Sequence, residues 1–346
     1  MDSYQAGRKL LRGVEGAGAE LAVSHERDDI MPVTGQSNTA IELIIVATIA
    51  LSACSPAEEG AAPGAADAIG EQQTVSLFGE RLYAQIDTTG AIAEADAALA
   101  AAPDDVEALI AAGRVRRDFW QYRGAMELYS RAMELAPDDW RPYRYRGHRH
   151  ISVREFDDAI EDLEAARERA SLNWDVSYHL GLAYFLAGRF GDAADEYQRC
   201  IGLAEDPAAR EAQKEDFRSC SQNGDDVESK VAMVEWAVRA TMRAGRDVET
   251  AALLDDIDPD LDVSVNIAYY HDLLFYKGLK TSQELLEPGP DAPYRLETVG
   301  MGVANWMLAQ GDVAGAREVL EELAQDPWWP GFGRIVAEVE LARLTR

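Results

Sequence analysis

The chain has 346 residues, of which 47% are hydrophobic, and a formal net charge of −29 at pH 7. This length accommodates two or three ordinary domains or one extended array, and the apolar content is sufficient to bury a large core. The negative charge argues against a nucleic-acid-binding protein, which needs a basic face to neutralise phosphates. It also argues against docking on an anionic membrane through charge alone.

The most apolar stretch, IELIIVATIALSACSPAEEG, occupies residues 41–60. Its apolar part is about half as long as the roughly 20 residues that a transmembrane helix needs, but it has the length of a signal-peptide apolar region. Its end, Leu51-Ser52-Ala53-Cys54, resembles the lipobox of bacterial lipoproteins: an aliphatic residue, two small residues and a cysteine. The resemblance implies cleavage before Cys54 and a diacylglycerol anchor on its thiol. It places the protein in the cell envelope on the periplasmic side, and Ser55 fits the outer membrane.

Two features depart from a lipoprotein signal. No Lys or Arg lies between Arg27 and Cys54, although a signal peptide has a basic start, and forty residues precede the apolar run. We interpret residues 1–40 as a disordered extension, with Met31 as an alternative start, and residues 41–54 as the signal segment. Residues 55–73, rich in Ala, Gly, Pro and acid, read as a flexible tether. The alternative is a cytoplasmic protein, with a short buried helix at the apolar run or with residues 1–60 as an unstructured tail.

An internal repeat of 34 residues follows the tether. Positions with this spacing are Gly79, Gly113, Gly147 and Gly181; Ala91, Ala125, Ala159 and Ala193; and Pro103 and Pro137. This pattern resembles the tetratricopeptide repeat (TPR), a pair of helices that stacks on its neighbours. The resemblance implies an all-α, right-handed superhelical solenoid of TPR-like helix pairs, with four regular repeats over residues 74–205.

Each repeat position has a physical role. The Gly and Ala sites lie where paired helices touch, and Tyr129, Leu163 and Tyr197 fill the space between one pair and the next. Pro ends the second helix, because it cannot continue the hydrogen-bond ladder. The acids after it cap the next helix, so we interpret them as capping groups and not as catalytic residues.

The register slips beyond Cys200. Residues 206–229 form an insertion, and residues 230–346 read as degenerate TPR-like repeats closed by a C-terminal capping helix, which terminal repeats require. No segment shows convincing strand alternation, and we expect about seven helical pairs from Thr74 to the end. As a whole, the region from Thr74 onward resembles bacterial TPR lipoproteins.

No catalytic constellation is visible in the sequence, which lacks HExxH, GxSxG and a phosphate-binding GK[ST] loop. We expect no enzymatic activity, no cofactor and no metal site, since His148 and His150 are two apart on a helix and face different sides. A hydrolase or sensor with a site near His271 in the degenerate repeats is a less favoured alternative.

A basic segment stands out in this acidic chain. From Arg114 to Arg154 there are ten Arg and five acids, a local balance of +5. In TPR proteins the first helix of each pair lines the concave groove, and this resemblance assigns the following residues to it: Arg114, Arg117, Arg141, Arg144, Tyr145, His148, Tyr178 and His179.

Arg binds carboxylates in a bidentate way and stacks on aromatic rings. The expected partner is therefore a protein or peptide, with an acidic segment or a C-terminus as candidates. The expected function is a non-enzymatic scaffold anchored to a membrane, and the alternative is a cytoplasmic TPR adaptor. A competing interpretation pairs these Arg side chains with acids on neighbouring repeats.

If Cys54 carries lipid, two cysteines remain. Cys200 and Cys220 are candidates for a disulfide in an oxidising compartment. Two unlinked thiols are the alternative, because the sequence does not give their separation in space.

Overall fold

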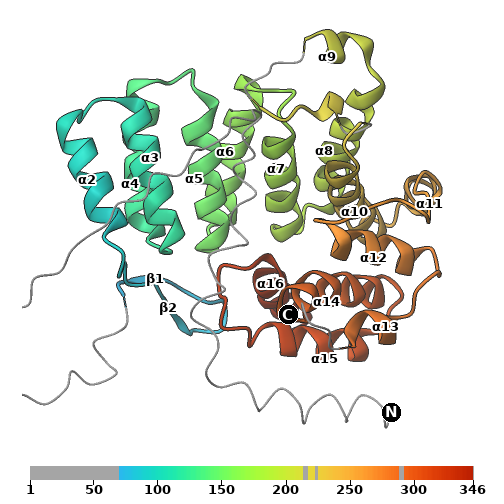
Figure 1. Cartoon of the computed structure of the whole chain (residues 1–346). Helices are drawn as coiled ribbons and strands as arrows, with labels where there is room; N and C mark the ends of the chain where they lie inside the picture. The colour runs from blue at the N-terminus through green and yellow to red at the C-terminus, as the bar shows by residue number, and fades with distance from the viewer. Residues whose placement is uncertain (1–69, 213–216, 223–224, 288–291, 346) are drawn as a thin grey trace, which may run out of the picture.

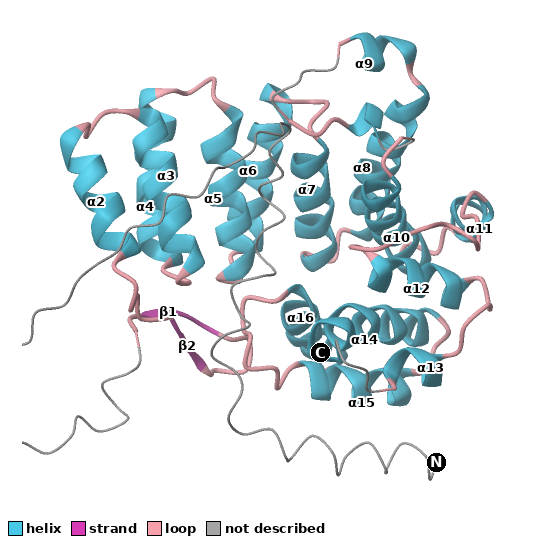
Figure 2. Cartoon of the chain, viewed as in Figure 1, coloured by secondary structure: helices cyan, strands magenta, loops and turns pink. Residues whose placement is uncertain are grey.

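The protein was examined as a computed structural model that describes residues 70–212, 217–222, 225–287 and 292–345. Within these ranges the fold is an all-α solenoid of TPR-like helix pairs with a small β-hairpin at its start (Figures 1 and 2). The predicted fold class is thereby confirmed. The predicted extension, signal segment, Cys54 and nearly all of the tether lie outside the described residues. None of the helices in the described part of the chain is long and apolar enough to cross a membrane.

The regular part of the solenoid contains three complete helix pairs. They are α3 (Val106–Asp118) with α4 (Tyr122–Leu135), α5 (Trp140–Ser152) with α6 (Phe156–Arg169), and α7 (Trp174–Leu186) with α8 (Phe190–Gly202). A single helix, α2 (Ala91–Ala101), precedes them. Asp105 and Asp139 cap α3 and α5 by accepting hydrogen bonds from backbone N–H groups, as predicted for the acids after Pro103 and Pro137.

The glycines of the repeat lie where paired helices touch. A Cβ atom on Gly113 would lie 2.4 Å from the ring of Tyr129, and one on Gly181 would lie 2.4 Å from the ring of Tyr197. The corresponding distance from Gly147 to Leu163 is 2.7 Å. Any side chain at these positions would therefore separate the two helices of its pair, which explains why glycine recurs every 34 residues along the repeat.

The first predicted repeat differs from the others. Where its first helix was expected, the chain forms an antiparallel hairpin of β1 (Gln72–Val75) and β2 (Arg81–Tyr83). Gly79 has φ 85° in the turn and touches no helix. The predictions of a helix here and of no strand are therefore wrong, and the regular array begins at α2. The reason is tertiary: Leu82 is buried against Tyr122, Val153 and Trp329, and an isolated hairpin would be marginal without such packing.

The later pairs are less regular. They comprise α10 (Val227–Arg243) with α11 (Asp247–Asp255), α12 (Ile267–Tyr276) with α13 (Ser282–Leu286), and α14 (Ala292–Ala309) with α15 (Val313–Leu323), followed by α16 (Phe332–Leu344). The described residues form six helix pairs, one fewer than the approximately seven that the sequence predicted. The short helix η4 (Leu203–Glu205) precedes the insertion, which contains α9 (Pro207–Glu211) and η5 (Cys220–Gln222).

The chain curls back on itself. In Figure 1 the C-terminal helices α14–α16 lie beside the ends of α5 and α7, and the hairpin lies between this group and the first pairs. The largest hydrophobic cluster joins side chains of α5–α8 to those of α10 and α14–α16, with Trp236 fully buried within it. The middle and last parts of the solenoid therefore share one core.

Candidate functional site

Five of the predicted residues form a continuous row along the first helices of three pairs. This Arg–His row consists of Arg114 on α3, Arg144, Tyr145 and His148 on α5, and His179 on α7. Equivalent positions of neighbouring first helices are 34 residues apart, as Arg114 is from His148 and Tyr145 from His179. Stacking of the pairs brings these equivalent positions side by side.

Ring and cation contacts hold the row together. The Cζ atoms of Arg114 and Arg144 lie 5.9 and 5.3 Å from the centre of the Tyr145 ring, within the range of cation–π attraction. The imidazoles of His148 and His179 lie 4.3 Å apart. Tyr145 also contacts Tyr129 of the second helix α4, which fixes its ring.

Arg144 is neutralised within the row. It is buried, and its Nη2 donates a hydrogen bond of 2.7 Å to Asp175 on the next first helix. Burial acts to raise the pKa of Asp175, but the Arg144 guanidinium and His179 outweigh it and hold that pKa below its ordinary value. At this position the competing interpretation, an Arg paired with an acid of a neighbouring repeat, describes the structure.

His148 is enclosed by the protein and has several cationic groups nearby. Burial lowers the pKa of His148 well below its ordinary value, and Arg149, His179 and Arg144 lower it further. Among the described residues, Nδ1 of His148 and Nη2 of Arg114 are buried without a hydrogen-bond partner. Of the two, Arg114 Nη2 is always a hydrogen-bond donor, so it is the atom that suits an anionic group.

The three other predicted residues have different surroundings. Arg141 pairs with Glu107 on α3 and with Asp139, the cap of its own helix. Arg117 is buried and pairs with Asp118. Tyr178 lies in the core, where its hydroxyl accepts a hydrogen bond of 2.9 Å from Trp236 Nε1 and lies 2.8 Å from the Tyr269 hydroxyl. Arg141 and Tyr178 thus join different helix pairs, whereas Arg117 pairs within α3.

The sequence did not indicate that the C-terminal segment reaches this row. The Phe332 ring lies 5.4 Å from His148 and 6.1 Å from His179. It therefore covers one end of the row, and Arg114 lies toward the other end. No local pattern could predict these contacts, because 184 residues separate Phe332 from His148 and 153 separate it from His179, and α16 carries no TPR signature.

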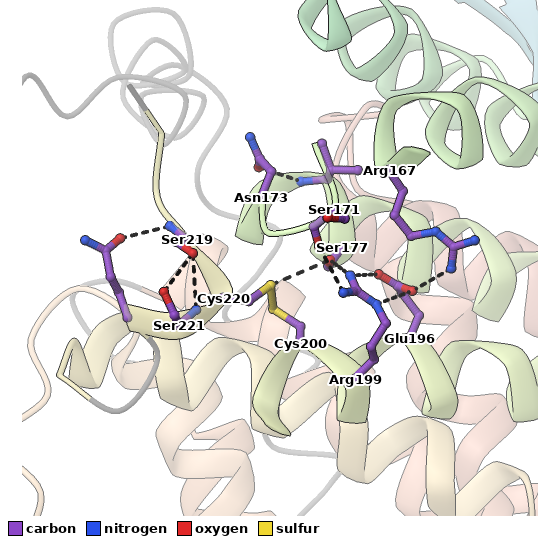
Figure 3. The surroundings of a disulfide bond; sticks show 12 residues. Arg167, Ser171, Asn173, Ser177, Glu196, Arg199, Cys200, Ser219, Cys220 and Ser221 are labelled. Atoms are coloured by element: carbon purple, nitrogen blue, oxygen red, sulfur yellow. Dashed lines mark hydrogen bonds and ion pairs between the residues drawn. A yellow bond between two sulfur atoms is a disulfide. The ribbon is translucent and has the colours of Figure 1, made fainter. Parts of the chain in front are cut away.

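The insertion covers the start of α7 and is tied down covalently. Cys200 on α8 and Cys220 on η5 form a disulfide with their Cα atoms 5.0 Å apart (Figure 3). The Cys220 N–H donates to the Leu172 carbonyl, and the Trp174 N–H donates to the Arg218 carbonyl. The insertion is thus attached to the turn that precedes α7.

A second polar cluster lies near His271 in the C-terminal pairs. Arg239 on α10 pairs with Glu235 one turn earlier and with Asp272 on α12, and all three side chains have no exposed surface. Burial raises the pKa of Asp272 well above its ordinary value. Because solvent does not reach these side chains, the cluster is a buried structural network and offers no access to a substrate.

The stacked helix pairs form a TPR-like solenoid, and one part of the chain matches a TPR family model. Residues 146–210 match the family model described as tetratricopeptide repeat. A curated relative, small glutamine-rich tetratricopeptide repeat-containing protein 2 of Saccharomyces cerevisiae, is 29% identical over 106 residues, 29% of each chain. The alignment thus spans less than a third of that protein's length.

Among solved structures, this chain is similar to the crystal structure of YrrB, described as a TPR protein with an unusual peptide-binding site. The TM-score is 0.38 with 15% identity, over 66% of this chain and 97% of that one.

Proposed function

We propose that this protein is a non-enzymatic scaffold that binds an acidic peptide segment or a C-terminal carboxylate along the Arg–His row. The observation that carries the proposal is the cationic and aromatic row around Tyr145, in which the half-buried Arg114 has an Nη2 without a hydrogen-bond partner. A carboxylate reaches this atom when the Arg114 side chain turns outward. A carboxylate could accept a charge-assisted hydrogen bond from Arg114 while its aliphatic neighbours pack on the Tyr145 ring.

The test is capture of acidic peptides by the Arg114→Glu variant. In an array of fluorescent peptides ending in Asp- or Glu-rich sequences, the native protein should retain a subset, with less retention at high salt. Loss of a hydrogen bond to a charged group costs about 1.5–3 kcal/mol, so Arg114→Glu should weaken binding by at least about tenfold.

Arg131→Glu is the matched control. It makes the same charge change at an exposed position of the second helix α4, where Arg131 pairs with Asp104. Arg144→Glu is unsuitable, because it would place two acids together in a buried site beside Asp175. Equal binding by Arg114→Glu and the native protein would exclude the row as the binding surface.

We further propose that Cys54 carries a lipid that anchors the protein on the periplasmic side of a bacterial membrane. The lipobox-like residues ending at Cys54 support this proposal, and so does the Cys200–Cys220 disulfide, because disulfides persist in oxidising compartments.

Metabolic labelling with palmitate tests the anchor. Label should enter the native protein and be absent from a Cys54→Ala variant that still folds. A native protein without label would instead favour the cytoplasmic adaptor.

A further inference from the structure

The turn between α5 and α6 brings a histidine and two carboxylates together. Arg154 adopts a left-handed conformation with φ 68°, and the next N–H, that of Glu155, donates a 2.9 Å hydrogen bond to the His150 carbonyl. This tight return places the Glu155 side chain beside the imidazole of His150. Asp158 lies in the first turn of α6, one helical turn after Glu155.

The donor atoms are close enough to share one cation. One ring nitrogen of His150 and one oxygen each from Glu155 and Asp158 lie within 4.8 Å of one another. The closest pair is His150 Nδ1 and Glu155 Oε2, at 2.8 Å. Two ligands at this separation, each about 2.1 Å from a common ion, subtend roughly 85° at the ion, so both can reach one cation from these positions.

Neighbouring side chains hold two of these ligands in place. The second oxygen of Glu155 pairs with Arg123 at 2.7 Å, which leaves Oε2 directed at His150. The other nitrogen of His150, Nε2, lies 3.6 Å from Asp162, a buried carboxylate that accepts two hydrogen bonds from Arg146. A carboxylate facing the second ring nitrogen of a histidine is a common way to orient a metal-binding imidazole.

We propose that His150, Glu155 and Asp158 bind one divalent transition-metal ion, with water completing its coordination. The imidazole ligand favours Zn²⁺ and similar ions over Mg²⁺ and Ca²⁺, which prefer oxygen ligands. Glu155, which also pairs with Arg123, and Asp158 place negative charge beside the ion, and the exposed Asp158 gives it access from solvent. The ion would join the end of α5 to the start of α6, on a side of α5 that faces Glu155 and not His179.

Isothermal titration of the tag-free full chain with Zn²⁺ tests this site. One Zn²⁺ should bind per chain, and binding should weaken at acid pH because the imidazole must lose its proton. Substitution of orienting groups around metal sites costs about 10–100-fold in affinity, so loss of a direct ligand in Asp158→Asn or His150→Gln should cost at least as much. Mg²⁺ should not compete with Zn²⁺ for this site.

Asp157→Asn is the matched control. It removes one exposed negative charge from the same turn at a residue outside the ligand set, and it should leave the Zn²⁺ affinity unchanged. The proposal is overturned if no Zn²⁺ heat is observed, or if Asp158→Asn binds as tightly as Asp157→Asn. His150 and Glu155 would then form a hydrogen-bonded pair only. Because Asp158 is exposed, its variant should fold normally, which circular dichroism can verify.

Discussion

At the residue scale, the same residue type has different consequences depending on its partners. Arg114 and Arg144 occupy the first helices of adjacent pairs, yet Arg144 is neutralised by Asp175 and Arg114 keeps an unused Nη2. The sequence indicated both as groove residues, because the repeat register determines which face of a helix a residue occupies. It could not indicate the pairing, because that depends on which acid the next helix presents.

The buried network of Arg239, Glu235 and Asp272 is also a residue-scale feature. One guanidinium cannot balance two carboxylates in a site without water, so burial raises the pKa of both acids. The phenol of Tyr276 donates to Glu235 at 2.9 Å, and Tyr269 also faces the network. The folded protein therefore retains a proton on Asp272 that the unfolded chain releases at a lower pH.

This retained proton predicts how stability depends on pH. As pH rises above the ordinary pKa of Asp272, the unfolded state loses its proton first, so the free energy of unfolding falls with pH. The contribution is at most about 1.4 kcal/mol per pH unit for one proton. Asp272→Asn should make this fall shallower and should be relatively more stable at pH 8 than at pH 5.

Urea denaturation of both proteins at pH 5 and pH 8 measures the effect. Asp258→Asn, a change at an exposed acid, serves as the control and should keep the native slope. Identical slopes for Asp272→Asn and the native protein would show that Asp272 ionises in the folded protein as it does in the unfolded chain.

At the element scale, the turns between the two helices of successive pairs form a series. Residues 120, 154 and 188 lie 34 apart, and all three have positive φ. In each turn the following N–H donates to the carbonyl five residues before it, an arrangement that requires a left-handed residue and favours glycine. Gly188 fits this rule, whereas Trp120 and Arg154 do not.

The exceptions are explained by the C-terminal segment, which packs along these turns. The Trp120 ring lies 5.8 Å from that of Trp329, and Arg154 pairs with the buried Glu338 at 2.7 Å. At the third turn, Arg343 donates to the carbonyls of Phe185 and Leu186. The contacts with the last part of the chain thus compensate for the backbone strain at the first two turns.

The Arg154→Gly variant tests whether the backbone strain at residue 154 or its ion pair with Glu338 has the larger effect on stability. Glycine would relieve about 1–3 kcal/mol of backbone strain, but removal of one partner of a buried ion pair costs about 3–5 kcal/mol. We expect a net loss of about 2 kcal/mol in the free energy of unfolding, measured by urea denaturation.

Addition of Glu338→Gln to Arg154→Gly should restore part of this loss, because no unpaired charge then remains buried. The recovery should be partial, since Arg334 and the Leu77 N–H also contact Glu338. If Arg154→Gly is as stable as the native protein, the ion pair contributes no more than the strain costs.

At the scale of the whole molecule, the solenoid is closed on itself. The hairpin contributes to this closure: Trp329 Nε1 donates to the Tyr83 carbonyl, and Arg334 pairs with Glu80 in the hairpin turn. The Arg–His row is consequently covered at one end by Phe332. In the proposed function a partner would enter from the side of α3, which is why Arg114 is the residue chosen to test binding.

The sequence by itself determined the three regular helix pairs of α3–α8 and the face that Arg114, Arg144, Tyr145, His148 and His179 share on their first helices. These follow from a 34-residue period, from glycines that permit close helix contact and from acids that cap the next helix, all of which act over short distances along the chain. The tertiary structure alone decided the hairpin, the disulfide, the pairing of Arg144 with Asp175 and the cover provided by Phe332. Each of these depends on segments that are distant in sequence, and a repeat pattern carries no information about which distant surfaces will meet.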